Sequence, residues 1–380
     1  MVTVRSKTTK KKNLFGRLPI ITKGGHRADF TLLFVVLMLS VFGLIMVYDA
    51  SIVEANEQFG DRFHYLKFQT AYFVLGWIGL LLLGRIDYHI YKKGIRWLFL
   101  GNLFFLLLVL IPGIGLQIKG VRRWIDLGIT TFQPTEPFKT ILVLYLASWL
   151  EKNRTLPQFA ALVLFVLGLV ILEPDLGSSI VLVSTMFVIY YIQGAPMMKF
   201  ALSSIAAFFL GLILIVSSPY RRQRLTTFLD SSSDITGSSY HIQQVIISLG
   251  SGGILGLGIG QSKQKYQYVP EAMTDSIVAI VGEELGFIGT VGLILLFMTI
   301  IWKGFKIAQN APDMYGRLVA TGITVWISVQ MFLNLASMVS LVPLTGVPLP
   351  FMSYGGTSLV VTLFSIGILL NISKQTVNAR

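Results

Sequence analysis

Long apolar stretches constrain this chain more than any other feature. A helix needs about 20 mostly apolar residues to cross the hydrocarbon core of a bilayer. Hydrophobic residues make up 54% of the 380 residues and charged residues only 13%, against about 25% charged residues in soluble domains. The sequence therefore predicts an all-α, polytopic membrane protein with about ten helices, near residues 30–50, 68–84, 95–113, 137–150, 157–173, 177–193, 199–217, 275–301, 316–340 and 353–373.

The distribution of Lys and Arg predicts how these helices are oriented. Cytoplasmic segments of membrane proteins carry the excess of basic residues, and the first 29 residues hold eight Lys or Arg. We therefore expect residues 1–29 to form a basic cytoplasmic tail near anionic lipid and residues 374–380 to be a cytoplasmic C-terminus. Between them, residues 30–373 form a single ten-helix domain. This N-in, C-in arrangement leaves a large extracytoplasmic loop at 218–275, between the seventh and eighth helices.

Composition also excludes several kinds of chemistry. The chain has no cysteine, which rules out disulfides, thiolate metal sites and cysteine nucleophiles. Its four histidines are far apart in the sequence, so no histidine-based metal motif is visible. A net charge of +13 would suit nucleic acid, but basic residues beside cytoplasmic helix ends explain it better. We therefore expect no nucleic-acid partner.

Some of the basic residues contradict the orientation rule. Of the 31 Lys and Arg residues, 20 fall in segments assigned to the cytoplasm and 11 outside, most of these in two loops. Arginine makes bidentate contacts to phosphate and lysine acts as a point charge, so these loops are candidates for an anion site. Contact with anionic lipid headgroups, or a solvated rim, is the alternative for each residue. The candidates are Arg122, Arg123, Arg221, Arg222, Arg224, Lys263 and Lys265.

The segment "PEAMTDSIVAIVGEELG" concentrates four of the 18 acidic residues. Ionisable groups at the edge of a span are costly and are functional candidates. Pro270 suits the first position of a helix, which would place Glu271 and Asp275 one turn apart. Asp275 would then lie at the outer mouth, where a carboxylate can act as a general base toward a hydroxyl. The alternative is that Asp275 only begins the helix and pairs with a cation. A helix N-terminus and nearby cations both favour the ionised carboxylate, which makes it a weaker base. Glu283 and Glu284 lie deeper and are expected to hold structure.

Two further motifs, "FQPTEPFK" and "EPDLGSS", place charges where predicted helices begin. Glu136 and Lys139 are three residues apart, so a local ion pair is the simplest interpretation. Asp175 follows a proline between two spans, where it either caps the next helix or contacts a substrate. The glycines of "SYGGTS" either end a loop or admit close helix packing.

In this order and spacing, the motifs resemble the SEDS family (shape, elongation, division and sporulation). The resemblance rests on "RRWIDLG", "FQPTEPFK", "EPDLGSS", "YRRQRLTTFLD", "SLGSGGILGLGIGQSKQKYQYVPEAMTDSIVAIVGEELG" and "PLTGVPLPFMSYGGTS", and covers nearly the whole chain. The linker "GQSKQKYQYVPEA" is similar to the FtsW branch, whereas RodA-type chains usually have Pro-Glu-Arg-His there. Met273 and Ser276 depart from the usual His and Phe beside the Thr-Asp pair, so the usual His partner of the acid is absent at that position.

The resemblance implies a peptidoglycan glycosyltransferase that polymerises lipid II on the outer face of the bacterial cytoplasmic membrane, in cell division. Asp275 matches the family's essential aspartate, which would deprotonate the 4-hydroxyl of the lipid II GlcNAc. That oxygen would attack C1 of MurNAc with inversion and loss of the lipid diphosphate. The candidate substrate-binding residues are Arg122, Arg123, Trp124, Glu136, Lys139, Asp175, Arg221, Arg222, Arg224, Lys263, Lys265, Glu271 and Ser353.

The resemblance also implies partners. A class B penicillin-binding protein would supply crosslinking and activate the chain, beside other divisome proteins and membrane lipid, at the division septum. No cofactor is certain, and a divalent cation, Mg²⁺ or Mn²⁺, would assist departure of the diphosphate.

Two other functions stay open at this point. A lipid II flippase would use the same cations, with polar groups distributed to both faces of the membrane. A non-catalytic scaffold for a penicillin-binding protein would tolerate any change at Asp275.

Overall fold

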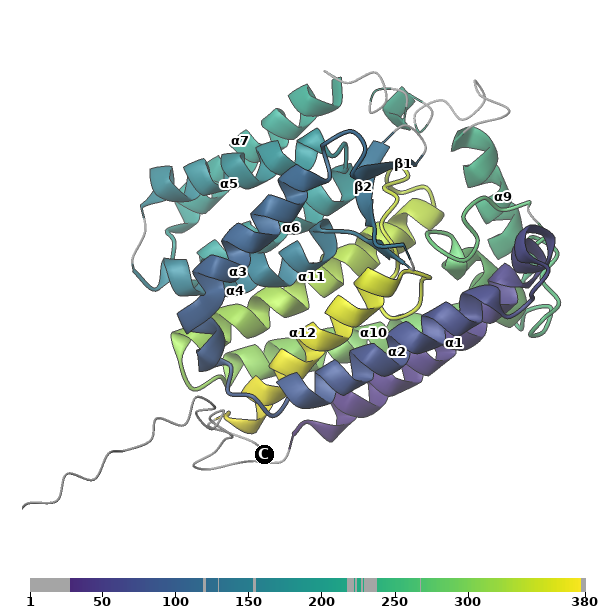
Figure 1. Cartoon of the computed structure of the whole chain (residues 1–380), viewed down its shortest axis with the longest axis horizontal. Helices are drawn as coiled ribbons and strands as arrows, with labels where there is room; N and C mark the ends of the chain where they lie inside the picture. The colour runs from purple at the N-terminus through teal and green to yellow at the C-terminus, as the bar shows by residue number, and fades with distance from the viewer. Residues whose placement is uncertain are drawn as a thin grey trace, which may run out of the picture.

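The computed structural model describes residues 28–118, 121–128, 130–152, 155–216, 222, 224–226, 228, 238–266 and 268–376. The predicted basic tail up to residue 27, the last four residues and Arg221 lie outside the described residues. Within the described part, the chain is mostly helical (Figure 1).

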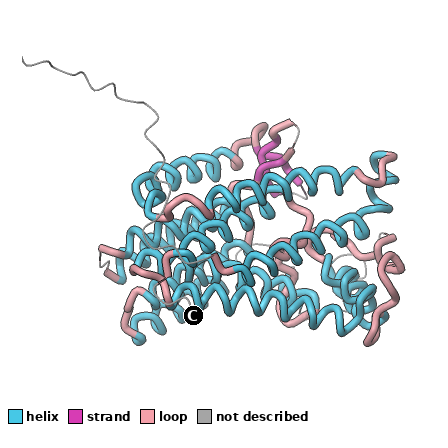
Figure 2. The backbone as a smooth tube through the Cα atoms, turned by 90° about the horizontal axis from the view of Figure 1, so that it is seen from below, coloured by secondary structure: helices cyan, strands magenta, loops and turns pink. Residues whose placement is uncertain are grey.

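Each of the ten predicted helices overlaps a helix of the structure. Within the residues that the structure describes, five helices, α1, α2, α10, α11 and α12, are long and apolar enough to cross a membrane. The helices run alongside one another, and the strands are confined to one small group (Figure 2). The helices are α1 (Phe30–Phe59), α2 (His64–Leu83), α3 (His89–Leu108), α4 (Thr135–Leu150), α5 (Leu156–Leu172), α6 (Leu176–Ile192), α7 (Met197–Val216), α9 (Ser238–Ser251), α10 (Ile277–Gln309), α11 (Met314–Met338) and α12 (Gly356–Lys374).

Two elements were not predicted. The helix α9 lies inside the segment 218–275, which the sequence predicts only as a loop. A three-stranded antiparallel sheet follows α3, formed by β1 (Gly115–Ile118), β2 (Val121–Asp126) and β3 (Thr131–Phe132) in that order. The all-α prediction therefore needs correction at this loop. The strands are too short to give a clear alternating pattern in the sequence.

The start of α10 is also different from the prediction. The helix begins at Ile277, not at Pro270. Glu271 has a φ of 54°, and the N–H groups of Thr274 and Ser276 both donate to its carbonyl at 3.1 Å. The hydroxyl of Ser276 then donates to the Pro270 carbonyl at 3.1 Å. These turn contacts replace the expected helical turn, so Glu271 and Asp275 do not share a helix face.

The glycine-rich segment after α9 completes a break in α10. The helix is interrupted at Gly286 (φ 64°, ψ −161°), which deprives neighbouring backbone groups of helical partners. The loop supplies these partners, because buried backbone groups require hydrogen bonds. The bonds run from Leu257 N–H to Glu283 O (3.0 Å), Gly258 N–H to Glu284 O (2.9 Å), Phe287 N–H to Gly253 O (2.9 Å) and Ile288 N–H to Ile254 O (3.2 Å).

Close backbone contact explains why this segment is rich in glycine. A Cβ on Gly252 would stand 2.0 Å from the Gly282 carbonyl oxygen, and one on Gly256 would stand 2.1 Å from that of Glu284. A Cβ on Gly286 would meet the Gly256 nitrogen at 2.3 Å. Backbone contact therefore joins the loop to the helix, while the side chains of Ile254, Leu255 and Ile259 stay exposed.

Glu283 and Glu284 hold this loop, as the sequence predicts. The Ser262 hydroxyl donates to Glu283 at 2.5 Å and its N–H donates to Glu284 at 3.1 Å. The N–H of Lys263 donates to Glu283 as well, at 3.1 Å. Both carboxylates are almost fully buried, so their main structural effect is to fix the loop that leads to Asp275.

The helix α11 lies at the centre of the bundle, where it packs against α4, α6, α10 and α12. In the most apolar 18-residue stretch of α11, 78% of the residues are buried inside the protein, whereas in that of α2 only 17% are. A helix enclosed by protein can carry buried amides that bond neighbouring loops, because protein rather than lipid surrounds them. Gln330 and Asn334 of α11 are such residues, and both are buried.

Candidate active site

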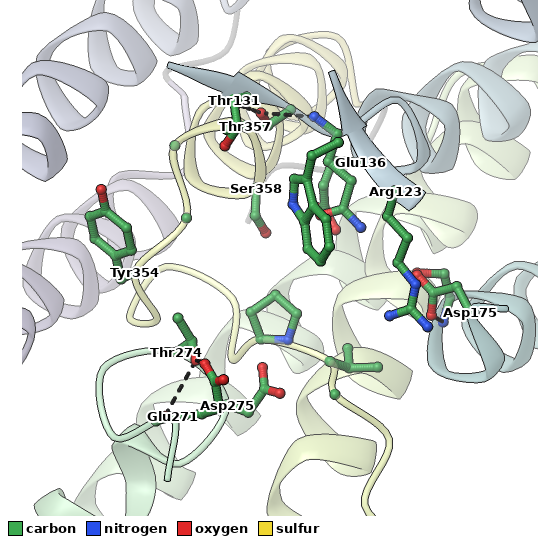
Figure 3. Close-up of a pocket in the computed structure, with 18 of the residues that line it drawn as sticks. Arg123, Thr131, Glu136, Asp175, Glu271, Thr274, Asp275, Tyr354, Thr357 and Ser358 are labelled. Carbon is green, nitrogen blue, oxygen red and sulfur yellow. Dashed lines mark hydrogen bonds between the residues drawn. The ribbon is translucent and has the colours of Figure 1, made fainter. Parts of the chain in front are cut away.

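A cavity of about 610 Å³ lies at one end of the helical bundle. Its lining comes from the beginnings of α2, α4, α6 and α12, the end of α11, strand β2 and the turn before α10. We call this end of the bundle the cavity end and the other the opposite end. Figure 3 shows Asp275 and Glu271 in one part of the cavity and Arg123 with Asp175 in another. The structure thus gathers several distant motifs around one space.

The cavity contains about half of the sequence-predicted site residues. The turn before α10 contributes acidic groups, the segment after α7 contributes an arginine, and β2 contributes an arginine beside a tryptophan. The candidates that line the cavity are Arg123, Trp124, Glu136, Asp175, Arg224, Glu271 and Asp275.

The backbone around Asp275 is held from several elements. The Asn334 amide of α11 donates to the Asp275 carbonyl at 2.8 Å. The Ser353 hydroxyl, just before α12, donates to the Thr274 carbonyl at 2.5 Å. Asp275 itself is half-buried at the cavity wall. This residue therefore has a fixed backbone and a side chain at the edge of the space.

Arg224 and Asp275 both approach a glycine of the loop after α11. A Cβ built on Gly346 would stand 3.5 Å from Oδ2 of Asp275 and 3.8 Å from Nη1 of Arg224. The same Nη1 donates to the Leu344 carbonyl at 2.9 Å. Gly346 has a φ of 69°, so the glycine suits both the backbone conformation and the close approach of the two charged groups.

Arg123 and Asp175 form a second polar group in the cavity. Nε of Arg123 donates to the Glu173 carbonyl at 3.0 Å, and Nη2 donates to that of Pro174. The Asp175 carboxylate accepts from the N–H of Ser178 at 3.0 Å and from its hydroxyl at 2.8 Å. Asp175 thus caps α6, one of the two roles expected from its position, while it also faces the cavity.

Glu173, next to this group, is a buried acid that the sequence does not single out. The residue is 0% exposed, and neither carboxyl oxygen has a hydrogen-bond partner among the described residues. Burial raises the pKa of Glu173 to about 9, with the charge of Asp175 adding to the effect and Arg123 opposing it. The carboxyl therefore keeps its proton at neutral pH.

Glu136 and Lys139 form the expected local ion pair. Nζ of Lys139 lies 2.8 Å from Glu136 Oε1 and donates to Gln330 Oε1 at 2.7 Å. Both charged side chains are at most 3% exposed. Glu136 reaches the cavity lining, but Lys139 lies behind it, since its donors are engaged by neighbours on α4 and α11.

Lys265 also lies away from the cavity. Its Nζ donates to Asp49 Oδ1 at 2.8 Å and to the Gly260 carbonyl at 2.7 Å, and lies 3.6 Å from Glu284 Oε1. These contacts direct it toward α1 and α10. Its role in the structure is to compensate two buried carboxylates.

The remaining candidates are outside the lining as well. Arg122 hydrogen-bonds Gln117 of the adjacent strand at 3.4 Å, because successive side chains of a strand point to opposite faces. Lys263 and Arg222 are exposed away from the cavity lining, and Ser353 is buried beneath it, where its hydroxyl also accepts from Leu349 N–H at 2.8 Å. These residues were predicted by sequence proximity to the motifs, which does not determine side-chain direction.

His241 is a cavity residue that sequence reasoning missed. It comes from α9, and its Nε2 lies 2.6 Å from the Ser276 hydroxyl oxygen. Ser276 directly follows Asp275, so a histidine approaches the acid's segment although Met273 takes the usual histidine position. Only its presence in the outer segment could have drawn attention to it, because 35 residues separate His241 from Ser276.

Comparisons with known proteins place the chain in a family. The model of a cell cycle protein family that unites FtsW, RodA and SpoVE matches residues 30–378. The chain belongs to this family. It is 40% identical to stage V sporulation protein E of Bacillus subtilis (strain 168), over 92% of this chain and 97% of the relative. It is 39% identical to a probable peptidoglycan glycosyltransferase FtsW of Geobacter sp. (strain M18), over 91% and 97%.

Solved structures agree with the fold of this FtsW/RodA/SpoVE family member. A peptidoglycan synthase complex that coordinates polymerization and crosslinking matches with a TM-score of 0.76 and 28% identity, over 93% of this chain and 99% of that one. The rod shape determining protein RodA of Thermus thermophilus matches with a TM-score of 0.69 and 27% identity, over 93% and 98%. The SEDS resemblance, nearer to FtsW than to RodA, is confirmed. With its apolar helices, the chain is a multi-pass membrane protein.

Proposed function

We propose that this family member is a peptidoglycan glycosyltransferase that polymerises lipid II. The observation that carries the proposal is that a carboxylate, Asp275, and a guanidinium, Arg224, both line the cavity and both approach Gly346. A base and a cation are the two groups that transfer of a sugar from a lipid diphosphate to a hydroxyl requires. Relatives named peptidoglycan glycosyltransferase support the same conclusion.

In this mechanism, Asp275 accepts the proton of the 4-hydroxyl of the acceptor GlcNAc. The oxygen forms a bond to C1 of the donor MurNAc while the bond from C1 to the diphosphate oxygen breaks, with inversion at C1. Negative charge develops on the departing lipid diphosphate. Arg123 and Arg224 stabilise that charge, because both guanidinium groups line the cavity and are held by backbone carbonyls. The proton remains on Asp275 until it passes to solvent.

A divalent cation, Mg²⁺ or Mn²⁺, is a further source of positive charge in this proposal. Across the described ranges, no group of three His, Asp or Glu side chains could hold a metal ion. Mg²⁺ commonly uses one or two carboxylates together with substrate phosphates, which fits Glu271, exposed at the cavity. We expect EDTA to lower the rate of polymerisation and added Mg²⁺ or Mn²⁺ to restore it.

The N-in, C-in orientation, which remains part of the proposal, assigns the cavity end to the outer face of the membrane. The basic residues at the beginning of α3, the end of α10 and the beginning of α11 lie toward the opposite end, which supports a cytoplasmic assignment there. The partners proposed for this face are a class B penicillin-binding protein and other divisome proteins at the division septum. Similarity to a synthase complex that joins polymerization and crosslinking supports such a pairing.

A flippase or a scaffold fits the site less well. A flippase needs a polar route to both membrane faces, whereas the lining of this cavity comes from one end of the bundle. A scaffold does not require the alignment of Asp275 with Arg224.

The deciding experiment compares Asp275→Asn with the parent in polymerisation of labelled lipid II by the purified protein and its transpeptidase partner. We expect the variant to lose at least about 100-fold in rate, because a general base contributes roughly that much or more. Asp61→Asn is the matched control, since Asp61 pairs with Lys67 on the surface, outside the cavity lining. Glycan of normal length and amount from folded Asp275→Asn would refute the proposal.

A further inference from the structure

One fully buried amide contacts two of the loops that form the cavity. Asn334, in the penultimate turn of α11, is 1% exposed. Its Nδ2 donates to the Asp275 carbonyl at 2.8 Å and to the Val347 carbonyl at 2.8 Å. Both hydrogens of the amide are therefore engaged, one on each loop.

One of these loops carries the carboxylate of the proposed reaction, and the other contacts its guanidinium. The first contains Asp275. The second, residues 344–348, contains Gly346, which both charged groups approach, and Leu344, whose carbonyl accepts from Arg224. The relative position of base and cation thus depends on contacts between the loops. Asn334 is a hydrogen-bond donor common to both.

We propose that Asn334 is a positioning residue that sets the distance between Asp275 and Arg224, an inference that rests on the proposed function. Asparagine and glutamine are the uncharged side chains that offer two hydrogens from one nitrogen, whereas a hydroxyl offers one and a carboxylate none. Replacement therefore releases at least one of the two loops. The loops need to shift by only about 1 Å for the loss in rate to reach roughly 100-fold.

Gln330 limits the damage that such a replacement does to the fold. It lies one turn earlier on the same face of α11, and its Nε2 donates to the Pro348 carbonyl at 2.9 Å. The loop 344–348 therefore stays attached to α11 when Asn334 is changed. What is lost is its link to the Asp275 segment, so the effect falls on alignment more than on stability.

Asn371 provides a matched control, since it is an equally buried asparagine at the opposite end. It is 0% exposed, its amide donates to the Gly84 carbonyl at 3.4 Å, and its Oδ1 accepts from Tyr88 N–H at 3.0 Å. It thus also joins a helix to a connecting segment by two backbone contacts. A purely structural asparagine should behave like Asn371.

The test measures kcat and KM for lipid II, with thermal unfolding in detergent, for Asn334→Ser and Asn371→Ser in complex with the partner. We expect Asn334→Ser to lower kcat about 10- to 100-fold with KM changed less than about 3-fold. We expect Asn371→Ser to lower the melting temperature at least as much as Asn334→Ser does, while its kcat stays within about 3-fold of the parent. If Asn334→Ser does not fold, Asn334→Thr is measured by the same criteria.

The outcomes separate the two proposals. Parent-like kcat in folded Asn334→Ser, a rise in KM alone, or an equal loss of kcat in Asn371→Ser would overturn the positioning role. In each of these cases, an active parent and an inactive Asp275→Asn leave the glycosyltransferase assignment intact. A parent that forms no glycan, or a fully active Asp275→Asn, would overturn the assignment and with it the inference.

Discussion

The two ends of the bundle use charged side chains differently. At the opposite end, ion pairs tie helices together while both partners stay partly exposed to solvent. At the cavity end, two pairs are buried in the protein, although the pair of Asp61 with Lys67 is exposed. At the opposite end, the side chains of Lys92 and Glu151 are 41% and 26% exposed, and those of His89 and Asp313 are 46% and 35% exposed. At the cavity end, the side chains of Lys139 and Glu136 are only 1% and 3% exposed, and those of Lys265 and Asp49 are 6% and 12% exposed.

This contrast indicates where breaking an ion pair should lower the free energy of unfolding most. An exposed pair contributes little, because water solvates each charge when its partner is lost. A buried pair leaves an uncompensated charge when it is broken. The cavity end is therefore the more fragile end, although it is also the end that holds the proposed reacting groups in place.

The largest effect is expected from Lys265→Met. Removing the ammonium leaves Asp49 and Glu284 as neighbouring buried carboxylates, so the free energy of unfolding should fall by about 3–5 kcal/mol. Denaturant unfolding of the purified protein in detergent measures the change. A loss below about 1 kcal/mol would mean that water reaches this group.

Glu173→Gln tests a buried acid at the cavity end that has no hydrogen-bond partner among the described residues. In the folded state, the carboxyl keeps its proton up to about pH 9, whereas its ordinary pKa is 4.5. Since the unfolded chain loses this proton first, folding stability should fall as pH rises between these values. We expect the variant to have a flatter pH dependence and a melting temperature about 2–4 °C higher at pH 8.

The control for this variant is Glu57→Gln, because Glu57 is exposed on the surface near the end of α1. It should leave the pH dependence of the melting temperature unchanged. An identical slope for Glu173→Gln and the parent would show that Glu173 is ionised in the folded protein.

Gly346→Ala and Gly60→Ala separate backbone strain from contact with the reacting groups. Their φ angles are nearly equal, 69° and 67°, but a Cβ on Gly60 meets nothing within 4 Å. Both variants should lose about 1 kcal/mol of stability. Only Gly346→Ala should also lower the rate of polymerisation, by about 10-fold, since its methyl group contacts Asp275 and Arg224. Equal rates in the two variants would show that the gap at Gly346 is not needed.

The smallest effect is expected from Lys92→Met, which breaks an exposed pair at the opposite end. The free energy of unfolding should change by less than about 1 kcal/mol, measured as for Lys265→Met. A loss as large as that of Lys265→Met would remove the contrast between the ends.

The helices were predictable because about 20 consecutive apolar residues leave few other solutions in a bilayer. The sheet after α3 and the turn from Pro270 to Asp275 were not, because tertiary hydrogen bonds determine both. Pro270 is compatible with a helix start, yet Asn334 and Ser353 donate to carbonyls of this segment and hold it as a turn. Local preference could not reveal this competition.

The site was predictable in its motifs more than in its side chains. Asp275, Arg123 and Arg224 reach the cavity, but Lys139 and Lys265 satisfy buried carboxylates instead. The position of a basic residue near a motif does not show which carboxylate it pairs with in the folded chain. Their roles in catalysis and binding stay predictions until the variants are measured.

The junction between the glycine-rich loop and α10 has a consequence for how this sequence can change. Gly252, Gly256 and Gly286 stand where helix and loop are in backbone contact, so a methyl group at any of them separates the two segments. A new side chain on the loop therefore requires a compensating backbone change in the helix, and one on the helix requires a compensating change in the loop. Such residues vary together or not at all, and random substitution libraries should recover them almost only as glycine.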